Sequence, residues 1–151
     1  MKWLLDTNVL SESVRPDPDE RVLAWIAAQS LVELAISLIT VAELRAGIAA
    51  SGNINRQKSF EAWMSAHIVP SFDERTLPIT LEILVDWIAL SRQLSARGRP
   101  KAAADLLIAS TARIHGLTVV TRNTRDFANT GIVVYDPWTG KTQAMDAPDA
   151  R

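Results

Sequence analysis

The feature that most constrains the fold is the alternation of short apolar runs with helix-like segments. Apolar runs of strand length cover residues 2–5, 34–39, 68–72, 117–121 and 132–135. Helices are predicted between them, over residues 19–28, 40–50, 56–66, 78–97 and 102–114. Within 78–97, for example, apolar residues recur at three- and four-residue steps. We therefore expect an α/β fold with a mostly parallel central sheet flanked by helices on both faces.

The chain length points to one domain. Its 151 residues leave little room for a second domain, and a hydrophobic content of 48% is enough to build a core. The polar, proline-containing end of the sequence lacks a helix or strand pattern. We expect one domain over residues 1–142 and a flexible tail over residues 143–151.

Composition excludes several classes of site and location. There is no cysteine, which rules out disulfides, thiolate zinc sites and a cysteine nucleophile. No apolar run approaches the roughly 20 residues of a membrane span, and no signal-peptide core precedes Asp6. We expect a cytoplasmic protein without a membrane partner. With 16 basic and 17 acidic residues, any binding of nucleic acid must be local.

Four acidic residues fall where the functional edge of such a sheet is expected. Asp6 directly follows the first strand, and Glu43 lies in the first turn of the helix after the second. Asp126 is in the loop after the strand that ends at Thr121, and Asp105 is near the start of the helix that leads into that strand. Ligands bind outside the carboxyl ends of parallel strands, so the four side chains can converge on one cleft.

Converging carboxylates repel one another, and a divalent cation removes that repulsion. Oxygen ligands without histidine or cysteine suit Mg²⁺ or Mn²⁺. Such a site can hold a phosphodiester, activate a water molecule and stabilise the leaving oxygen.

Each acid also has a structural interpretation. Asp6 could cap the helix that follows it, and Thr40 with Glu43 fits a capping box. Asp105 near a helix N-terminus is favoured by the helix dipole, and Asp126 could be a solvated loop residue. The joint arrangement of the four favours the functional interpretation.

Four segments, in order, resemble the motifs of PIN domains. They are LLDTNVL (residues 4–10), ISLITVAELRAG (36–47), ADLLIA (104–109) and GLTVVTRN through the acid and phenylalanine at 126–127 (from residue 116). Each is short, but the ordered set covers nearly the whole chain. It is most similar to the VapC-type toxins, including the FitB-like branch.

The resemblance implies an endoribonuclease that hydrolyses RNA phosphodiester bonds with Mg²⁺ or Mn²⁺ held by Asp6, Glu43, Asp105 and Asp126. It also implies a homodimer, inhibited by a small antitoxin that binds operator DNA. Some relatives have an aspartate where this chain has Asn123, so either Asp126 or Asn123 could complete the site.

Polar and basic residues near these motifs are further candidates. Asn8, Thr121 and Asn123 could orient water or carboxylates. Five cations could contact RNA phosphates: Arg97, Arg99, Lys101, Arg122 and Arg125. The first three could instead form a solvated loop. Trp25, Trp63 and Trp87 lie on apolar helix faces, whereas Trp138 is expected to be exposed and available to a partner.

Three other functions stay open at this point. The chain could be a PIN-type nuclease of RNA processing without an antitoxin, or a non-catalytic binding module with this fold. A phosphohydrolase with Asp6 as nucleophile is disfavoured, because Asn8 stands where such enzymes have a second acid. The module is disfavoured because all four acidic positions can be filled.

Overall fold

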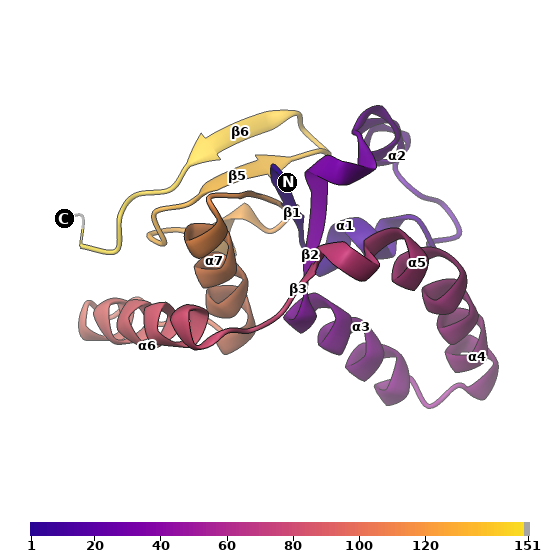
Figure 1. The fold of residues 1–151 in the computed structure, drawn as a ribbon, viewed down its shortest axis with the longest axis horizontal. Coiled ribbons are helices and arrows are strands. Elements are labelled where there is room, and N and C mark those ends of the chain that lie inside the picture. Colours follow the sequence, from indigo (N-terminus) through magenta and orange to yellow (C-terminus); the bar gives the residue numbers. More distant parts are fainter. Residues whose placement is uncertain (150–151) are drawn as a thin grey trace.

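The computed structural model describes residues 1–149 and contains one six-stranded sheet in the order β3-β2-β1-β4-β5-β6 (Figure 1). The first five strands are parallel, and β6 is antiparallel to β5. The strands are β1 (Trp3–Leu5), β2 (Leu34–Ser37), β3 (Thr76–Leu77), β4 (Thr118–Val120), β5 (Val133–Asp136) and β6 (Lys141–Ala144).

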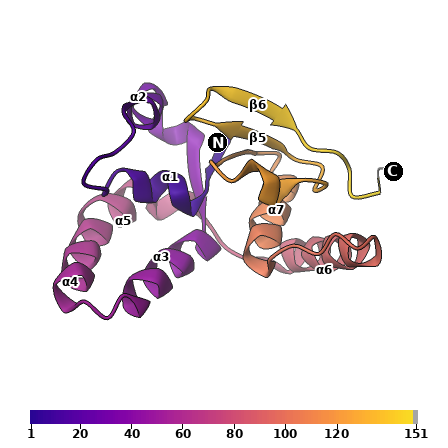
Figure 2. The same cartoon turned by 180° about the vertical axis from the view of Figure 1, so that it is seen from behind.

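Helices cover both faces of the sheet (Figures 1 and 2). The helices are α1 (Thr7–Glu12), α2 (Glu20–Ala28), α3 (Leu38–Ala50), α4 (Ile54–Trp63), α5 (Val69–Phe72), α6 (Leu81–Ala96) and α7 (Ala103–His115). Short 3-10 or π turns lie at η1 (Leu31–Glu33), η2 (Met64–Ile68), η3 (Asp73–Arg75) and η4 (Thr124–Phe127). No helix within residues 1–149 is both long and apolar enough to cross a membrane.

The alternation of side chains along the central strand divides the core into two. Leu4 packs in a cluster with α6 and α7, and the next residue, Leu5, packs in a second cluster with α1, α2 and α3. Both side chains are buried, as a strand covered on both sides requires. The predicted α/β architecture is confirmed.

The strand order reverses beside β1. The chain passes from β1 outward through β2 to β3, then returns to place β4 on the other side of β1. The carboxyl ends of β1 and β4 therefore flank a topological switch point, where a crevice is expected. Asp6 follows β1 and Thr121 follows β4 at this position.

The third predicted strand, residues 68–72, is wrong. This segment is helical, because residue 68 ends η2 and residues 69–72 form α5. The strand that pairs with β2 at the edge of the sheet is β3. Met64, Ile68 and Phe72 are all buried, and their four-residue spacing is that of one helix face. Pro70 lies in the first turn of α5, where its missing N–H costs nothing.

The second predicted strand ends earlier than expected, at Ser37 instead of residue 39. The Ser37 hydroxyl accepts a hydrogen bond from the Ile39 amide (3.2 Å), so Ser37 caps α3. Thr40 is then inside the helix and buried, and the capping box predicted for Thr40 and Glu43 is wrong. Glu43 lies in the second turn of α3, not in the first.

The C-terminal segment is more ordered than predicted. Residues 143 and 144, assigned to a flexible tail, belong to β6, where Gln143 pairs with Val134. Met145 packs against the core cluster of α6 and α7, and its amide donates to the Ile132 carbonyl (2.8 Å). Residues 150–151 of the predicted tail lie outside the described residues.

Trp138 is buried, in contrast to the prediction that it is exposed. Its side chain is 6% accessible and belongs to the core cluster beneath α1 and α2. The Asp136 carboxylate accepts a hydrogen bond from the Trp138 amide (2.8 Å), which turns the chain back onto the sheet. The Arg122 guanidinium lies 5.4 Å from the centre of its ring.

Candidate functional site

Asp6 is fixed at the switch point by three hydrogen-bond donors. Its Oδ1 accepts from the Thr7 amide (2.7 Å), which makes Asp6 the N-cap of α1 as well as the acid that ends β1. Its Oδ2 accepts from the Thr121 hydroxyl (2.7 Å) and the Asn8 amide group (3.2 Å). The capping and functional interpretations of Asp6 are therefore compatible.

The Thr121 hydroxyl has its full set of hydrogen bonds. It donates to Asp6 and accepts from the Asn8 side chain (3.1 Å) and the Asn123 amide (3.0 Å). The Asn8 carbonyl oxygen accepts from the Arg122 amide (3.2 Å). The side chains of Asn8 and Thr121 thus orient Asp6 and join the first motif to the loop after β4. Asn123 contributes through its backbone amide, which donates to the Thr121 hydroxyl.

The environment of Asp6 disfavours its charged form. Burial raises the pKa of Asp6, and the charges of Glu43 and Asp126 add to the rise. Hydrogen bonds from Thr121 and Thr7 oppose part of it. A nearby cation would stabilise the charged form of an acid held in this way.

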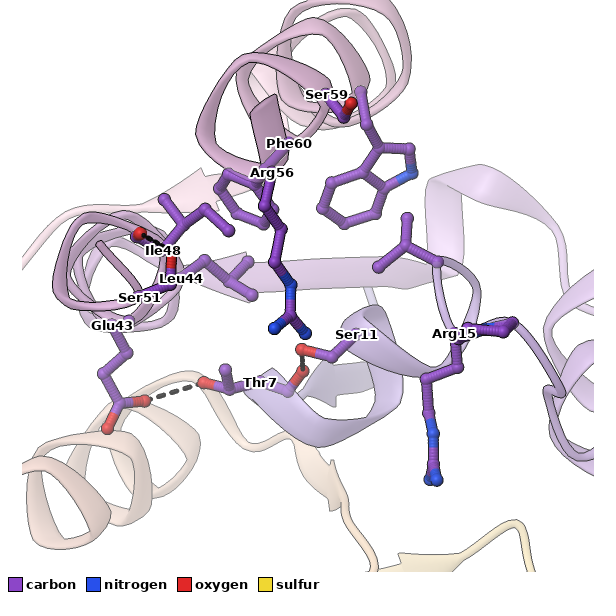
Figure 3. A pocket seen from close by; sticks show the side chains of 14 residues that line it. Thr7, Ser11, Arg15, Glu43, Leu44, Ile48, Ser51, Arg56, Ser59 and Phe60 are labelled. Carbon is purple, nitrogen blue, oxygen red and sulfur yellow. Dashed lines mark hydrogen bonds between the residues drawn. The ribbon is translucent and has the colours of Figure 1, made fainter. Parts of the chain in front are cut away.

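Glu43 reaches the site from α3. Its Oε2 accepts a hydrogen bond from the Thr7 hydroxyl (2.7 Å), which Figure 3 shows as a dashed line between α3 and α1. Thr7 was not predicted as a site residue. The available signal was its position directly after Asp6, at the first residue of a helix that begins at the sheet edge.

Asp105 is the third residue of α7 and is half-buried. Its pKa is raised from 3.8 to about 6, first by burial and then by three nearby negative charges, those of Asp126, Asp6 and Glu43. Lys101 opposes the rise. These couplings place the four predicted acids in one electrostatic neighbourhood.

Three of the predicted acids also share a pocket. Asp6, Glu43 and Asp105 line a cavity of about 430 Å³, to which Asn123 contributes. Asp126 does not line it but lies in η4, close enough for its charge to raise the pKa of Asp105. Asn123 therefore lines the pocket, whereas Asp126 lies outside it and acts on Asp105 through its charge.

The donor set is made of carboxylate oxygens, which fit a hard divalent cation. Within residues 1–149, these side chains do not already form a compact metal-binding cluster. Asp6, Glu43 and Asp105 face a common space instead. The pKa values of Asp6 and Asp105 are raised first by burial and then by the charges of the neighbouring acids, and a cation opposes both effects.

The pocket has a basic rim. Arg15 and Arg122 line it, together with Glu12, whose side chain is 3% accessible. The Glu12 carboxylate accepts from the Asp19 amide (2.7 Å) and forms an ion pair with Arg15 (3.3 Å). Neither Arg15 nor Glu12 was predicted. Glu12 ends α1 and Arg15 lies in the turn after it, and the sequence pattern did not define the path of this segment.

Two of the other predicted cations, Arg99 and Lys101, hold loops together. Arg99 donates to the Asn129 side chain (3.0 Å), and Lys101 donates to the Arg125 carbonyl (2.8 Å). These contacts join the loop before α7 to the loop after β4. Arg97 is the C-cap of α6. Of the five predicted phosphate contacts, Arg122 is the one that lines the acidic pocket.

An apolar groove adjoins the acidic pocket and shares lining residues with it. Figure 3 shows the side chains that line this groove. It has a volume of about 680 Å³ and lies between α1, α3 and α4, with Leu44, Ile48, Phe60 and Trp63 among its lining residues. Glu43 lines both the groove and the acidic pocket. A molecule bound in the groove would therefore lie next to the Glu43 carboxylate.

The raised pKa of Asp105 predicts a pH-dependent effect on stability. An acid whose pKa is higher in the folded state destabilises the fold as pH rises from about 4 to about 6, and the penalty is complete above that range. We expect Asp105→Asn to stabilise the metal-free protein at pH 7.5 by on the order of 1 kcal/mol, after allowance for solvent screening of a half-exposed group. At pH 4 the gain should be close to zero.

Thermal unfolding at the two pH values measures this difference. A gain of that size corresponds to about 2–4 °C in Tm. Glu74→Gln, at an exposed acid outside the pocket, is the control and should show no such pH-dependent gain. An Asp105→Asn protein that is no more stable than the wild type at pH 7.5 would contradict the assigned electrostatics.

Comparison with protein families finds a match to the family described as PIN domain, over residues 3–133. The chain is 40% identical over 135 residues to the toxin FitB of Neisseria gonorrhoeae, covering 89% of this chain and 97% of the relative. It is also 40% identical over 135 residues to the VapC ribonuclease Y4jK of Sinorhizobium fredii, covering 89% and 96%.

The fold of this chain is also similar to that of a solved structure. The structure of FitAB bound to an IR36 DNA fragment matches with a TM-score of 0.83 and 39% sequence identity. The match covers 90% of this chain and 95% of the other.

Proposed function

Because this chain belongs to the PIN-domain family, we propose that it is an endoribonuclease that acts as the toxin of a toxin–antitoxin pair. The observation that carries the proposal is the meeting of Asp6, Glu43 and Asp105 in one pocket at the switch point of the sheet. The names of its relatives, a toxin and a ribonuclease, agree with this chemistry.

The proposed cofactor is Mg²⁺ or Mn²⁺, held by Asp6, Glu43 and Asp105, with Asp126 nearby. When bound, such an ion polarises a phosphate oxygen and lowers the pKa of a water molecule. The side chains of the protein supply the negative charge that holds it. Thr121 and Asn8 fix the direction of the Asp6 carboxylate, so that the site is organised before substrate arrives.

The proposed substrate is RNA, and hydrolysis replaces one P–O ester bond of its backbone by a bond to the oxygen of water. Binding requires local positive charge, because the chain has a formal net charge of −1. Arg15 and Arg122 supply this charge at the rim of the pocket. They can contact the phosphates on either side of the cleaved bond.

The proposed inhibitor is a small antitoxin that also binds operator DNA. The similar FitAB structure was solved with a DNA fragment. The apolar groove between α1, α3 and α4 offers such a partner a binding site beside Glu43, with a volume of about 680 Å³. An apolar segment bound there covers one side of the acidic pocket and prevents RNA from entering.

A homodimer is part of the same proposal. Leu81, Val85 and Ile88 form an exposed apolar stripe on α6, with accessibilities of 78%, 60% and 43%. Their spacing places them on one helix face, and contacts between copies of the chain would cover it. Sedimentation of the purified protein as a monomer at micromolar concentration would contradict this part of the proposal.

Expression of the chain alone in bacteria tests the toxin function. We expect growth arrest soon after induction, because the nuclease cleaves cellular RNA without its inhibitor. The Asp105→Asn variant, expressed at the same level, should permit normal growth. Co-expression of the small protein encoded beside this chain should relieve the arrest.

Normal growth at high expression of the wild-type protein would argue against a toxin. If the purified protein nevertheless cleaves RNA, the alternative is a PIN-type nuclease of RNA processing without an antitoxin. If it neither cleaves RNA nor arrests growth, the non-catalytic binding module is favoured.

A further inference from the structure

Thr7 contacts two of the site acids through two different groups. Its backbone amide donates to Asp6 Oδ1 (2.7 Å), and its side-chain hydroxyl donates to Glu43 Oε2 (2.7 Å). Asp6 ends β1 and Glu43 comes from α3, so these contacts join an acid at the sheet edge to an acid on a separate helix. Figure 3 shows the hydroxyl of Thr7 directed at Glu43.

The Thr7 hydroxyl is held by a rigid base. Thr7 is the first residue of α1, which is anchored by the buried side chains of Val9 and Leu10. A β-branched side chain in a helix has few permitted rotamers, two for threonine, and the hydroxyl of Thr7 is in the rotamer that reaches Glu43. The hydroxyl has one proton to donate, and in this structure it donates to Glu43.

Glu43 lacks comparable rigidity of its own. A glutamate side chain has three rotatable bonds and loses considerable entropy when it is held in one place. Its charge also repels Asp6, as the raised pKa of Asp6 reflects. A neutral donor at a fixed position offsets both effects and keeps the carboxylate at the pocket.

We propose that Thr7 is the positioning residue for Glu43. Its hydroxyl holds the carboxylate within reach of the cation that the acidic pocket binds. The inference rests on the proposed metal-dependent nuclease function. Without the hydroxyl, Glu43 is free to turn toward solvent or toward the adjoining groove, which it also lines.

Three variants isolate the hydroxyl. Thr7→Val keeps the size, the β-branch and the backbone amide that binds Asp6, and it removes only the donor to Glu43. Thr7→Ser restores the donor. Ser13→Ala is the matched control, because Ser13 caps the end of the same helix and its hydroxyl donates to the Leu10 carbonyl (2.8 Å), while the residue lines neither the acidic pocket nor the groove.

We expect Thr7→Val to weaken Mn²⁺ binding, measured by calorimetry without RNA, by about 10- to 100-fold. The rate of RNA cleavage at saturating RNA should fall by a similar factor. Thr7→Ser should restore most of both quantities, and Ser13→Ala should match the wild type. Far-UV circular dichroism and the Tm verify that each variant is folded.

A double-mutant cycle decides whether Thr7 acts through Glu43. In a Glu43→Ala background, Thr7→Val should cause no further loss of Mn²⁺ affinity. Wild-type Mn²⁺ affinity in Thr7→Val, or an equal loss in both backgrounds, would overturn the inference.

The same measurements separate this inference from the proposed nuclease function. A wild-type protein that binds Mn²⁺ but cleaves no RNA refutes the nuclease and leaves the calorimetric test of Thr7 intact. A wild-type protein that binds no Mn²⁺ refutes the positioning role along with the metal site.

Discussion

The Asp6→Asn and Asp105→Asn variants should each cleave RNA about 10²- to 10³-fold more slowly than the wild type while they remain folded. A bound cation contributes several kcal/mol to the stabilisation of the transition state, and each 1.36 kcal/mol corresponds to a factor of ten in rate. Removal of one charged ligand forfeits a large part of this stabilisation. The proposed mechanism therefore predicts a large effect from a change that is nearly isosteric.

The fold should survive both changes for different reasons. Asparagine at position 6 can still accept from the Thr7 amide through its side-chain oxygen, because asparagine is as good an N-cap as aspartate. Its amide nitrogen cannot accept the bonds that Thr121 and Asn8 donate to Oδ2, which costs about 1–3 kcal/mol of the roughly 5–15 kcal/mol available to such a domain. Asp105 is half-buried, and its charge disfavours the folded state, so its neutralisation does not remove a stabilising contact. Equal circular dichroism spectra would verify this.

The measurement is the initial rate of cleavage of a purified RNA in the presence of Mg²⁺ or Mn²⁺. Excess chelator should abolish the activity of the wild type, and Glu74→Gln should cleave at the wild-type rate. Full activity in chelator, or in both asparagine variants, would reject the metal-dependent mechanism.

The Phe127→Ala variant should lose about 3–5 kcal/mol of folding stability. Phe127 is fully buried at the end of η4, in the core cluster formed by α6, α7 and the sheet. Truncation of its ring removes apolar contacts and leaves a cavity that the surrounding helices and strands cannot fully close. A domain of this kind has a total stability of about 5–15 kcal/mol, so the loss is a substantial part of it.

Urea unfolding at neutral pH measures this loss as a decrease in the free energy of unfolding. Phe60→Ala is the matched comparison, because Phe60 is only partly buried and should cost less. The effect should also reach the site, since Phe127 anchors the turn that contains Asp126. A loss below about 1 kcal/mol would show that this turn is not held by its core residue.

Several elements were predictable because their signals are local. The strand ending at Asp6, the long helix α6 and the glycine that ends α7 depend on apolar spacing and backbone preference within a few residues. Gly116, for example, has φ +65°, the left-handed conformation expected for the residue after a helix. Such features do not require knowledge of distant parts of the chain.

The wrong predictions share a different physical cause. Residues 68–72 form a strand-length apolar run, but their burial against the sheet selects the helical spacing of Met64, Ile68 and Phe72. Trp138 follows a polar turn, yet the hydrogen bond from its amide to Asp136 directs it into the core. The tertiary contacts of the core, with α1 and α2 around Trp138 and with the sheet around residues 68–72, overrode a weak local pattern in both places.

The sequence by itself determined the alternation of strands and helices around β1, β2, β4 and β5, the absence of cysteine chemistry, and the four acidic positions near the ends of strands or the starts of helices. It could not determine how those acids are held. Only the tertiary structure decided that Thr121 and Asn8 fix Asp6, that Thr7 binds Glu43, and that Arg15 stands at the rim of the pocket. Hydrogen bonds form between side chains according to their separation in space, and residues 6 and 121 become neighbours only when β1 pairs with β4.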